Sequence, residues 1–413
     1  MKIGIVGLGY VGLPLAMEFA DAGHAVIGVD VDLAKVQALR EDRSHIEDVP
    51  DSRLARLAER CSFSTRFADL HAADAVLICV PTPLTANREP ELGPLLSAAR
   101  ALSSVIRSGQ VIVLESTTFP GTTRDYVAPL LEESGLRAGT DFALAFSPER
   151  VDPGRTDYTI ATTPKIVGGL TAACTERASG IYATICERVV PVGTPEVAEM
   201  SKLLENIFRS VNIALVNEMA MLADRMGIDM WEVVDAASTK PFGFMRFEPG
   251  PGMGGHCLPV DPFYLTWRAR EYDFATEFIE LAGKVNQTMP YFCVEKIERA
   301  LNDMGKPVKG SRVVVLGVSY KPGVGDIRES PALKIIDLLQ ARGAELAYHD
   351  EHVPELASRG LRHSELADAL EGADLVAIVT AHPGTDHDAV ARAAPVVDFR
   401  GVTRQRSHAG AHR

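Results

Sequence analysis

The chain has 413 residues, of which 46% are hydrophobic and 23% are charged, a composition typical of a globular protein and not of a disordered one. Since ordinary domains hold about 100 to 200 residues, this length predicts three domains. The formal net charge of -13 argues against a general binder of nucleic acid or of an anionic membrane, because either would favour a positive surface.

The six cysteines are widely spaced and form no Cys-x-x-Cys pair, which is typical of reduced thiols in a cytoplasmic protein. The uncharged stretch from Ile3 to Met17 contains glycines and Pro14, which fit a strand, a turn and a helix better than a signal peptide or a membrane span of roughly 20 residues. We therefore expect a cytoplasmic location, no membrane or nucleic acid partner, and no metal site.

The first part of the chain alternates short apolar runs with helical patterns. Strand candidates are Lys2 to Val6, Ala25 to Val29, Ala75 to Val80 and Val111 to Leu114, and further runs are Phe142 to Phe146, Lys165 to Val167 and Val189 to Val192. This rhythm predicts βαβ units around a parallel sheet. The pattern changes near Pro195, and we place the first domain at residues 1–195.

A glycine fingerprint, Gly7-Leu8-Gly9-Tyr10-Val11-Gly12, follows the first apolar run and precedes a helical pattern. In that context the glycines permit a tight turn, a close approach to a pyrophosphate and close packing of the helix. We assign Gly7, Gly9, Tyr10, Val11 and Gly12 to a dinucleotide site. The alternative is that the glycines only close a strand-to-helix turn.

Asp30 ends the next strand candidate, where its carboxylate would accept hydrogen bonds from the adenosine ribose of the dinucleotide. Asp32 adds negative charge and no arginine stands beside the pair, which favours NAD over NADP. The alternative role for Asp30 is to cap the helix that follows. Thr82 and Thr117 lie in loops after later strands, at the edge where ligands bind in open parallel sheets, and we expect both to line the cofactor cleft.

A long amphipathic helix is predicted from Glu196 to about Met226, because apolar residues recur there at steps of three and four. Helical patterns continue at Trp231 to Ala237 and at Phe274 to Leu301. We assign residues 196–305 to a central helical domain. The long helix exposes more apolar length than a small helical layer covers, so we expect a homodimer or higher homo-oligomer through this region.

A second α/β rhythm starts with the strand candidate Arg312 to Leu316 and continues with a helix at Pro331 to Ala341. Further strand candidates are Glu345 to His349, Leu375 to Val379 and Val396 to Phe399. We assign residues 306–404 to a smaller Rossmann-like domain and residues 405–413 to a frayed tail. The predicted fold is therefore α/β, with two Rossmann-like domains with parallel sheets joined by a central all-helical region.

The segment from Gly250 to Tyr264 places the thiol of Cys257 in a run of glycines, four residues before the carboxylate of Asp261. Glycines expose backbone amides, and a thiol beside clustered N-H groups can react as its thiolate and hold an oxyanion. Lys202 and Asn206 are four residues apart on the long helix, so both side chains can point at one developing alkoxide. Without further information, this pair could equally be a solvated helix face.

Together these residues resemble the UDP-glucose/GDP-mannose dehydrogenase family along nearly the whole chain. The motifs occur in the family's order: Gly9-Tyr10-Val11-Gly12-Leu13-Pro14, Ser147-Pro148-Glu149, Lys202-Leu203-Leu204-Glu205-Asn206, Gly254-Gly255-His256-Cys257, and Tyr320-Lys321-Pro322 with Arg328-Glu329-Ser330-Pro331. Members of this family oxidise the C6 alcohol of a nucleotide sugar to a carboxylate with two NAD. The segments Lys240 to Met245 and Asp261 to Tyr272 look most like the branch that acts on UDP-N-acetylglucosamine.

The resemblance implies a role for each catalytic candidate. Cys257 attacks the C6 aldehyde to give a thiohemiacetal and then a thioester. Lys202 and Asn206 stabilise the alkoxide, Asp261 orients or deprotonates the attacking group, and Thr117 helps to hold a water. Glu149 activates the water that hydrolyses the thioester.

The resemblance also implies that Arg328 binds the pyrophosphate of the cofactor and that the C-terminal domain binds the UDP-sugar. Its implied substrate contacts are Glu149, Arg150, Lys202, Asn206, Arg246, Phe247, Gly254 and Lys321, with Arg246 acting from a partner subunit. UDP-N-acetylglucosamine is the expected substrate, and UDP-glucose and UDP-N-acetylmannosamine are the alternatives.

Two other functions remain open at this point. A two-electron β-hydroxyacid dehydrogenase shares the dinucleotide domain, the helical region and a catalytic lysine, but has no use for Cys257. A dinucleotide-binding protein without catalysis would keep the fold alone. Counting NADH per sugar separates these functions.

Overall fold

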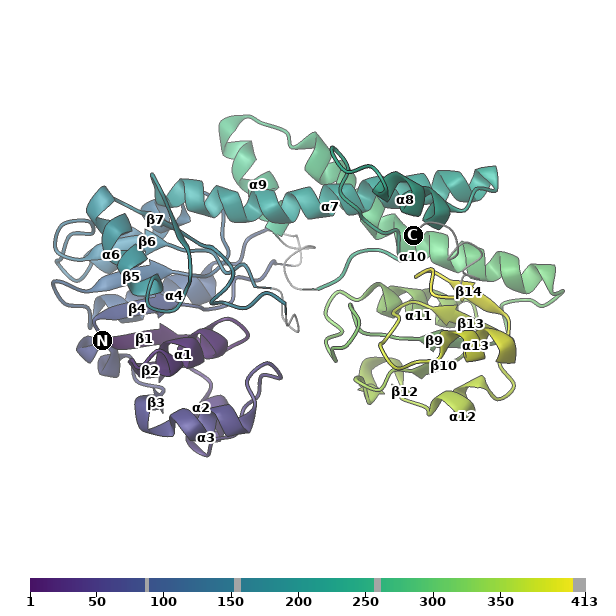
Figure 1. Ribbon diagram of the computed structural model, residues 1–413, viewed down its shortest axis with the longest axis horizontal. Helices are drawn as coiled ribbons and strands as arrows, with labels where there is room; N and C mark the ends of the chain where they lie inside the picture. The colour runs from purple at the N-terminus through teal and green to yellow at the C-terminus, as the bar shows by residue number, and fades with distance from the viewer. Residues whose placement is uncertain (86–88, 152–156, 256–260, 404–413) are drawn as a thin grey trace. The chain divides into compact units, whose positions relative to one another are not determined.

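The computed structural model describes residues 1–85, 89–151, 157–255 and 261–403 (Figure 1). The chain forms two compact units: the first comprises Met1–Glu205 and Phe263–Ala275, and the second comprises Asn206–Pro262 and Thr276–Arg413. The boundary falls inside the long helix α7 (Pro195–Met226). The predicted division at residues 195 and 305 stays a prediction, and the predicted tail lies outside the described residues.

The first unit is built on a sheet whose strands, within the described residues, follow the order β3-β2-β1-β4-β5-β6-β7-β8. The strands are β1 (Lys2–Val6), β2 (Ala25–Val29), β3 (Cys61–Ser64), β4 (Ala75–Ile78), β5 (Val111–Leu114), β6 (Ala143–Phe146), β7 (Lys165–Gly169) and β8 (Val189–Val192). The strand order reverses between β1 and β4, and ligands bind at such a switch point in open α/β sheets. This order confirms the predicted α/β class.

The pairing of β6 with β7 is antiparallel, unlike the parallel pairing from β3 through β6. Phe146 lies opposite Gly168 in this pair, so β7 begins near the edge of the sheet where β5 and β6 end. A polar residue at the start of β7 is therefore delivered to the ligand edge. The sequence did not indicate this reversal, because apolar runs carry no sign of strand direction.

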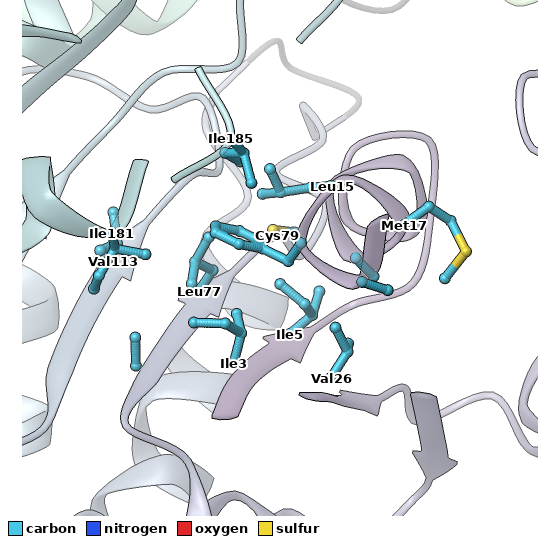
Figure 2. Packing of buried hydrophobic residues seen from close by; sticks show 14 of the residues in the cluster. Ile3, Ile5, Leu15, Met17, Val26, Leu77, Cys79, Val113, Ile181 and Ile185 are labelled. Atoms are coloured by element: carbon cyan, nitrogen blue, oxygen red, sulfur yellow. The ribbon is translucent and has the colours of Figure 1, made fainter. Parts of the chain in front are cut away.

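Successive side chains of each strand point to opposite faces of the first sheet. They form two hydrophobic cores, one on each face. Ile3 and Ile5 of β1 pack with Leu77, Val113 and helical residues on one face, as Figure 2 shows. Val6, Val76 and Ile112 face the other core. The helices of this unit are α1 (Gly12–Asp21), α2 (Leu33–Arg40), α3 (Asp51–Leu57), α4 (Gly93–Ser103), α5 (Ala128–Glu132) and α6 (Ala172–Tyr182). Burial on both faces explains the nearly continuous apolar runs of these strands.

The second unit contains a smaller parallel sheet in the order β10-β9-β13-β14. Its strands are β9 (Arg312–Leu316), β10 (Glu345–His349), β13 (Leu375–Ile378) and β14 (Val396–Asp398), and a hairpin joins β11 (Glu355–Leu356) to β12 (Leu361–Arg362). Its helices include α8 (Met230–Ser238), α10 (Glu277–Asp303), α11 (Pro331–Ala341), α12 (Leu366–Leu370) and α13 (His387–Ala393). The helix α9 (Asp261–Ala269) belongs to the first unit from Phe263 onwards. In the described part of the chain, no helix is long and apolar enough to cross a bilayer.

Candidate active site

The glycine fingerprint forms the turn between β1 and α1, as predicted. Gly7 has a φ of +90° and donates a hydrogen bond to the carbonyl of Val29 across 2.8 Å. A Cβ on Gly12 would lie 1.8 Å from the carbonyl oxygen of Gly7, so this position accepts only glycine without a backbone shift. A Cβ on Gly9 would meet no heavy atom of the described structure within 4 Å. The space beside Gly9 therefore suits a ligand that approaches the backbone closely, as a pyrophosphate does.

Asp30 is buried at the end of β2, and its carboxylate organises this turn. Its two oxygens accept hydrogen bonds from the backbone amides of Leu8, at 2.8 Å, and Asp32, at 2.9 Å. Asp32, not Asp30, caps α2, because its side chain accepts from the amides of Ala34 and Lys35. The helix-capping alternative for Asp30 is thus wrong, and its carboxylate is held at the edge of the sheet beside the glycine turn.

The loops after β4 and β5 are tied together at the same edge. Thr82 donates its hydroxyl to the carbonyl of Thr117 at 2.6 Å, and Ser116 donates to the carbonyl of Val80 at 2.6 Å. Tyr264 also donates a hydrogen bond to the carbonyl of Thr82. These bonds fix the positions of Thr82 and Thr117 on neighbouring strand ends.

A buried charge cluster lies where β5, β6 and β7 meet. The Nζ of Lys165 is 2.8 Å from Oε2 of Glu115 and 3.8 Å from Oε2 of Glu149. Tyr182 donates its hydroxyl to the other oxygen of Glu115. Burial alone would lower the pKa of Lys165, but the charges of Glu115 and Glu149 outweigh it and raise that pKa. The cluster holds a charged lysine beside Glu149, and no pattern in the sequence indicated this contact.

Arg150 lies beside Glu149 and is fixed by the protein itself. Its guanidinium pairs with Glu205 at 2.7 Å and donates to the carbonyl of Pro164 at 2.6 Å. Glu205 belongs to α7, so this pair joins the loop after β6 to the long helix.

Lys202 is nearly buried on α7, with 9% of its surface exposed. Within the described residues its ammonium has no hydrogen bond or ion pair. A lysine that has lost most of its hydration without gaining a partner is suited to bind the oxygen of a ligand. Glu199, one turn earlier, instead accepts hydrogen bonds from the amides of Gly121 and Thr123 and from the hydroxyl of Thr123.

Asn206 donates its side-chain amide to Oδ2 of Asp261, the buried first residue of α9. This contact joins α7 to the end of the segment that contains the predicted nucleophile. Cys257 itself lies outside the described residues, between Gly255 and Asp261. Lys202 and Asn206 lie on one helix but on opposite sides of the boundary between the two units.

The glycines before Cys257 pack closely against the loop that follows β9. The amide of Gly255 donates to the carbonyl of Arg328 at 3.0 Å, and a Cβ on Gly255 would lie 2.9 Å from the ring of Tyr320. A Cβ on Gly254 would lie 2.8 Å from the carbonyl oxygen of Glu329. Glu329 has a φ of +51°, a left-handed conformation that is uncommon for a side-chain-bearing residue and that persists where neighbours enforce it.

The predicted basic residues of the second unit are held by protein groups. Arg328 forms a two-pronged pair with Asp326, with its closest approach at 2.6 Å. The ammonium of Lys321 lies 5.7 Å from the ring centre of Tyr320. Arg246 pairs with Asp235 at 2.8 Å and with Glu248 at 3.1 Å. These contacts with protein groups orient each cation.

Phe247, next to Arg246, packs edge-on against Phe208 of α7, with ring centres 5.8 Å apart. The structure thus brings the candidates together in two groups. The first unit holds Gly7, Gly9, Tyr10, Val11, Gly12, Asp30, Thr82, Thr117, Glu149, Arg150 and Lys202, and the second holds Asn206, Arg246, Phe247, Gly254, Asp261, Lys321 and Arg328.

Family comparison divides the chain into three matching segments. Residues 1–186 match the NAD binding domain of the UDP-glucose/GDP-mannose dehydrogenase family. Residues 196–288 match the central domain of that family, and residues 314–405 match its UDP binding domain. The predictions of an NAD site and of a UDP-binding domain are confirmed.

Individual relatives agree with the family match. The UDP-N-acetyl-D-mannosamine dehydrogenase of Pyrococcus horikoshii is 37% identical, over 93% of this chain and 90% of the relative. The UDP-N-acetyl-D-glucosamine 6-dehydrogenase of Pseudomonas aeruginosa is 35% identical, over 82% of this chain and 79% of the relative. Among solved structures, a UDP-D-ManNAc dehydrogenase from Pyrococcus horikoshii superposes with a TM-score of 0.89 at 34% identity, covering 99% of this chain and 97% of that one.

Proposed function

This chain belongs to the UDP-glucose/GDP-mannose dehydrogenase family of NAD-dependent oxidoreductases, and we propose that it oxidises the C6 alcohol of UDP-N-acetylglucosamine to the carboxylate. The observation that carries this proposal is the hydrogen bond from Asn206 to Asp261. This bond links α7, which carries the candidate oxyanion-binding residues Lys202 and Asn206, to the segment that contains the candidate nucleophile Cys257. A dehydrogenase that stops after one oxidation would need no such link.

Two molecules of NAD, bound in turn at this site, would each supply the acceptor for one hydride from the sugar carbon. The turn from Gly7 to Gly12 would hold its pyrophosphate, because Gly9 leaves open space and Gly12 lets the helix approach closely. Asp30 would accept hydrogen bonds from the adenosine ribose through its remaining lone pairs. Thr82 and Thr117 would line the cleft, and Arg328 would add a charge for the pyrophosphate.

Lys202 and Asn206 would stabilise negative charge at the C6 oxygen during each oxidation. The ammonium of Lys202 has no protein partner within the described residues, so its charge is available to that oxygen. Asn206 is already oriented by Asp261, and this second contact limits the rotamers of its amide. Asp261 can in turn accept a proton from the attacking group.

Cys257 would attack the C6 aldehyde to form a thiohemiacetal, which the second oxidation converts to a thioester. The neighbouring glycines allow close approach of backbone amides, and Gly255 is held against Tyr320 and Arg328. Glu149 would then take a proton from the water that releases the acid. Its carboxylate lies half-buried after β6, in contact range of the charged Lys165.

The substrate's nucleotide would be bound by cations that the structure already orients. Lys321 and Arg150 are the candidates for the UDP-sugar, with Glu149, Phe247 and Gly254 as its other neighbours. Arg246 would reach the nucleotide sugar of a partner subunit. Its ion pairs with Asp235 and Glu248 are partly exposed, so exchanging them for phosphate costs little.

A homodimer through α7 completes the proposal. Large apolar side chains recur along the exposed face of this helix: Phe208, Leu215, Met219, Leu222 and Met226, each between 43% and 62% exposed. A contiguous apolar surface of this kind is typical of a protein interface. A second copy of the same helix supplies a matching face in a two-fold symmetric dimer.

UDP-N-acetylmannosamine is the second candidate substrate, because the relative and the solved structure from Pyrococcus horikoshii carry that specificity in their names. The test is to incubate the protein with NAD and separate UDP-sugars: N-acetylglucosamine, N-acetylmannosamine and glucose. We expect the highest kcat/KM with UDP-N-acetylglucosamine and a uronate product. A preference of tenfold or more for either other sugar would reassign the substrate.

A further inference from the structure

Two backbone amides and one ammonium hold the carboxylate of Glu149, and the mechanism proposed above uses none of these three groups. Its Oε1 accepts hydrogen bonds from the backbone amides of Arg150 and Val151, both at 2.7 Å. Its Oε2 faces the ammonium of Lys165 at 3.8 Å. The amides fix one oxygen, so the other oxygen is the one left to meet water.

Buried protein groups in turn hold the side chain of Lys165 in place. Its side chain is 5% exposed, and its ammonium donates to Glu115 at 2.8 Å and to the carbonyl of Pro148 at 3.0 Å. The Glu115 side chain is 0% exposed and also accepts from Tyr182. The bond to Pro148 places the lysine directly on the residue that precedes Glu149.

This arrangement depends on the antiparallel strand β7. Because Phe146 lies opposite Gly168, the first residue of β7 lies beside the loop that follows β6, where the ammonium of Lys165 approaches Glu149. A parallel β7 would have carried its first residue to the far edge of the sheet. The reversal therefore delivers a cation to the carboxylate that follows β6.

We propose that Lys165 is a positioning residue that holds the carboxylate of Glu149 in place and aimed at the hydrolytic water. The inference deepens the proposed function and rests on it. In the step concerned, the oxygen of water bonds to the acyl carbon while Glu149 takes a proton from that water. The carbon-sulfur bond then breaks, the sulfur leaves as a thiolate, and the sugar acid is free. Lys165 touches neither water nor sugar and acts through Glu149.

In the part of the chain that the structure describes, the ammonium of Lys165 lies between two carboxyl groups, those of Glu115 and Glu149, so removing either charge should have a measurable effect. Among the described residues, the ionisable groups that interact with the charge of Glu149 include Lys165 from β7, Glu115 after β5, Cys79 after β4 and Cys186 after α6. Burial raises the pKa of Cys79 well above its ordinary value and that of Cys186 to about 11, so both thiols stay neutral near pH 7. The ammonium of Lys165 attracts the carboxylate of Glu149, and the carboxylate of Glu115 repels it.

The experiment compares Lys165→Met, Glu115→Gln and Tyr182→Phe in the full chain, using the UDP-sugar that the wild type oxidises. The readouts are the pH profile of acid release in a single turnover and the mass of the enzyme-bound acyl species. Lys165→Met should move the acidic limb of the profile to higher pH and accumulate the acyl-enzyme. Glu115→Gln should move that limb down.

A purely structural role for Lys165 would not shift the two profiles in opposite directions. Tyr182→Phe removes a hydrogen bond to Glu115 but no formal charge and should change the profile less than either charge variant, and Lys165→Arg should keep the wild-type profile. KM for the sugar should stay within about threefold in every variant, since Lys165 does not touch the sugar. If Lys165→Met does not fold, the direction seen with Glu115→Gln decides alone.

The outcomes separate this inference from the proposed function. A wild type that yields one NADH per sugar, or no acid, contradicts the proposed function. A wild type that yields two NADH, with both charge variants keeping the wild-type profile, contradicts only the role of Lys165.

Discussion

Asn206 of α7 donates a hydrogen bond to Asp261, although 55 residues separate them in the chain. Asp261 ends the glycine-rich segment and begins α9, so the contact fastens that segment to the long helix. An amide that is oriented in this way can present its remaining N-H to a developing oxyanion without reorganising.

Replacing Asn206 with Ala removes a donor that the proposed mechanism uses at the C6 oxygen. We expect kcat to fall by about 10²-fold, the usual effect of losing one oxyanion donor, with a smaller change in KM. Steady-state NADH formation measures both. Asn212→Ala is the matched control, because within the described residues the amide of Asn212 donates to the carbonyl of Phe208 in the same helix and makes no other hydrogen bond that the structure shows. Equal losses in the two variants would point to helix damage and not to catalysis.

Two glycines of the fingerprint should respond differently to alanine. Gly12→Ala forces a Cβ to within 1.8 Å of the carbonyl of Gly7, so it should destabilise the first unit. Gly9→Ala meets no described protein atom within 4 Å and should leave thermal unfolding unchanged. It should still weaken NADH binding by about tenfold, ~1.4 kcal/mol, because the new methyl occupies the ligand's space. Fluorescence titration with NADH checks this, and unchanged affinity for Gly9→Ala would argue against the assigned pyrophosphate site.

Glu199 predicts a dependence of stability on pH. Burial raises the pKa of this carboxyl to about 7 despite the hydrogen bonds from Thr123 and Gly121 that favour its charge. The native state therefore binds a proton that the unfolded state releases at lower pH, so this group's contribution to the free energy of unfolding falls as pH rises from about 4.5 to 7. The shift corresponds to on the order of 3 kcal/mol.

The measurement for Glu199 is chemical denaturation at several pH values, for the wild type and for Glu199→Gln. The glutamine cannot ionise, so the difference in stability between the two proteins should grow steadily in the variant's favour between pH 5 and 7. A constant difference over that range would mean that Glu199 keeps an ordinary titration.

The apolar face of α7 predicts a dimer, and charged side chains introduced on that face should dissociate it. Leu215→Glu combined with Met219→Glu places two carboxylates on a surface that is 57% and 43% exposed in the single chain. Light scattering after size exclusion should show the wild type as a dimer or larger and this variant as a monomer. Glu218→Lys, an exposed charge change on the same stretch of helix, should keep the wild-type mass. A monomeric wild type would remove the basis for a role of Arg246 across subunits.

Much of the fold follows from local pattern. The ranges of β1, β2, β5, β9, β10 and α11 agree with the runs predicted from the sequence, because buried parallel strands and amphipathic helices leave strong periodic signals. Strand β3 was missed, since Cys61 to Ser64 includes two serines and only four residues. The glycine fingerprint could be recognised in the sequence because the turn requires glycines and these glycines recur at a fixed spacing.

The site could be predicted only in part from the sequence, because its contacts join segments that are far apart in the chain. The sequence placed Glu149 and Lys202 among the candidates through the family motifs, but it did not pair Asn206 with Asp261. The sequence did not predict a contact of Lys165 with the carboxylates of Glu115 and Glu149. That contact depends on strand direction, which hydrophobicity does not encode.

The most direct test of the account is the number of NADH formed per UDP-sugar carboxylate, measured by absorbance and product mass in the wild type and in Cys257→Ser. We predict two NADH per acid in the wild type, and loss of acid release with retained UDP-sugar binding in Cys257→Ser. One NADH per sugar in the wild type, or acid formation at the full rate by Cys257→Ser, would contradict the covalent route through Cys257.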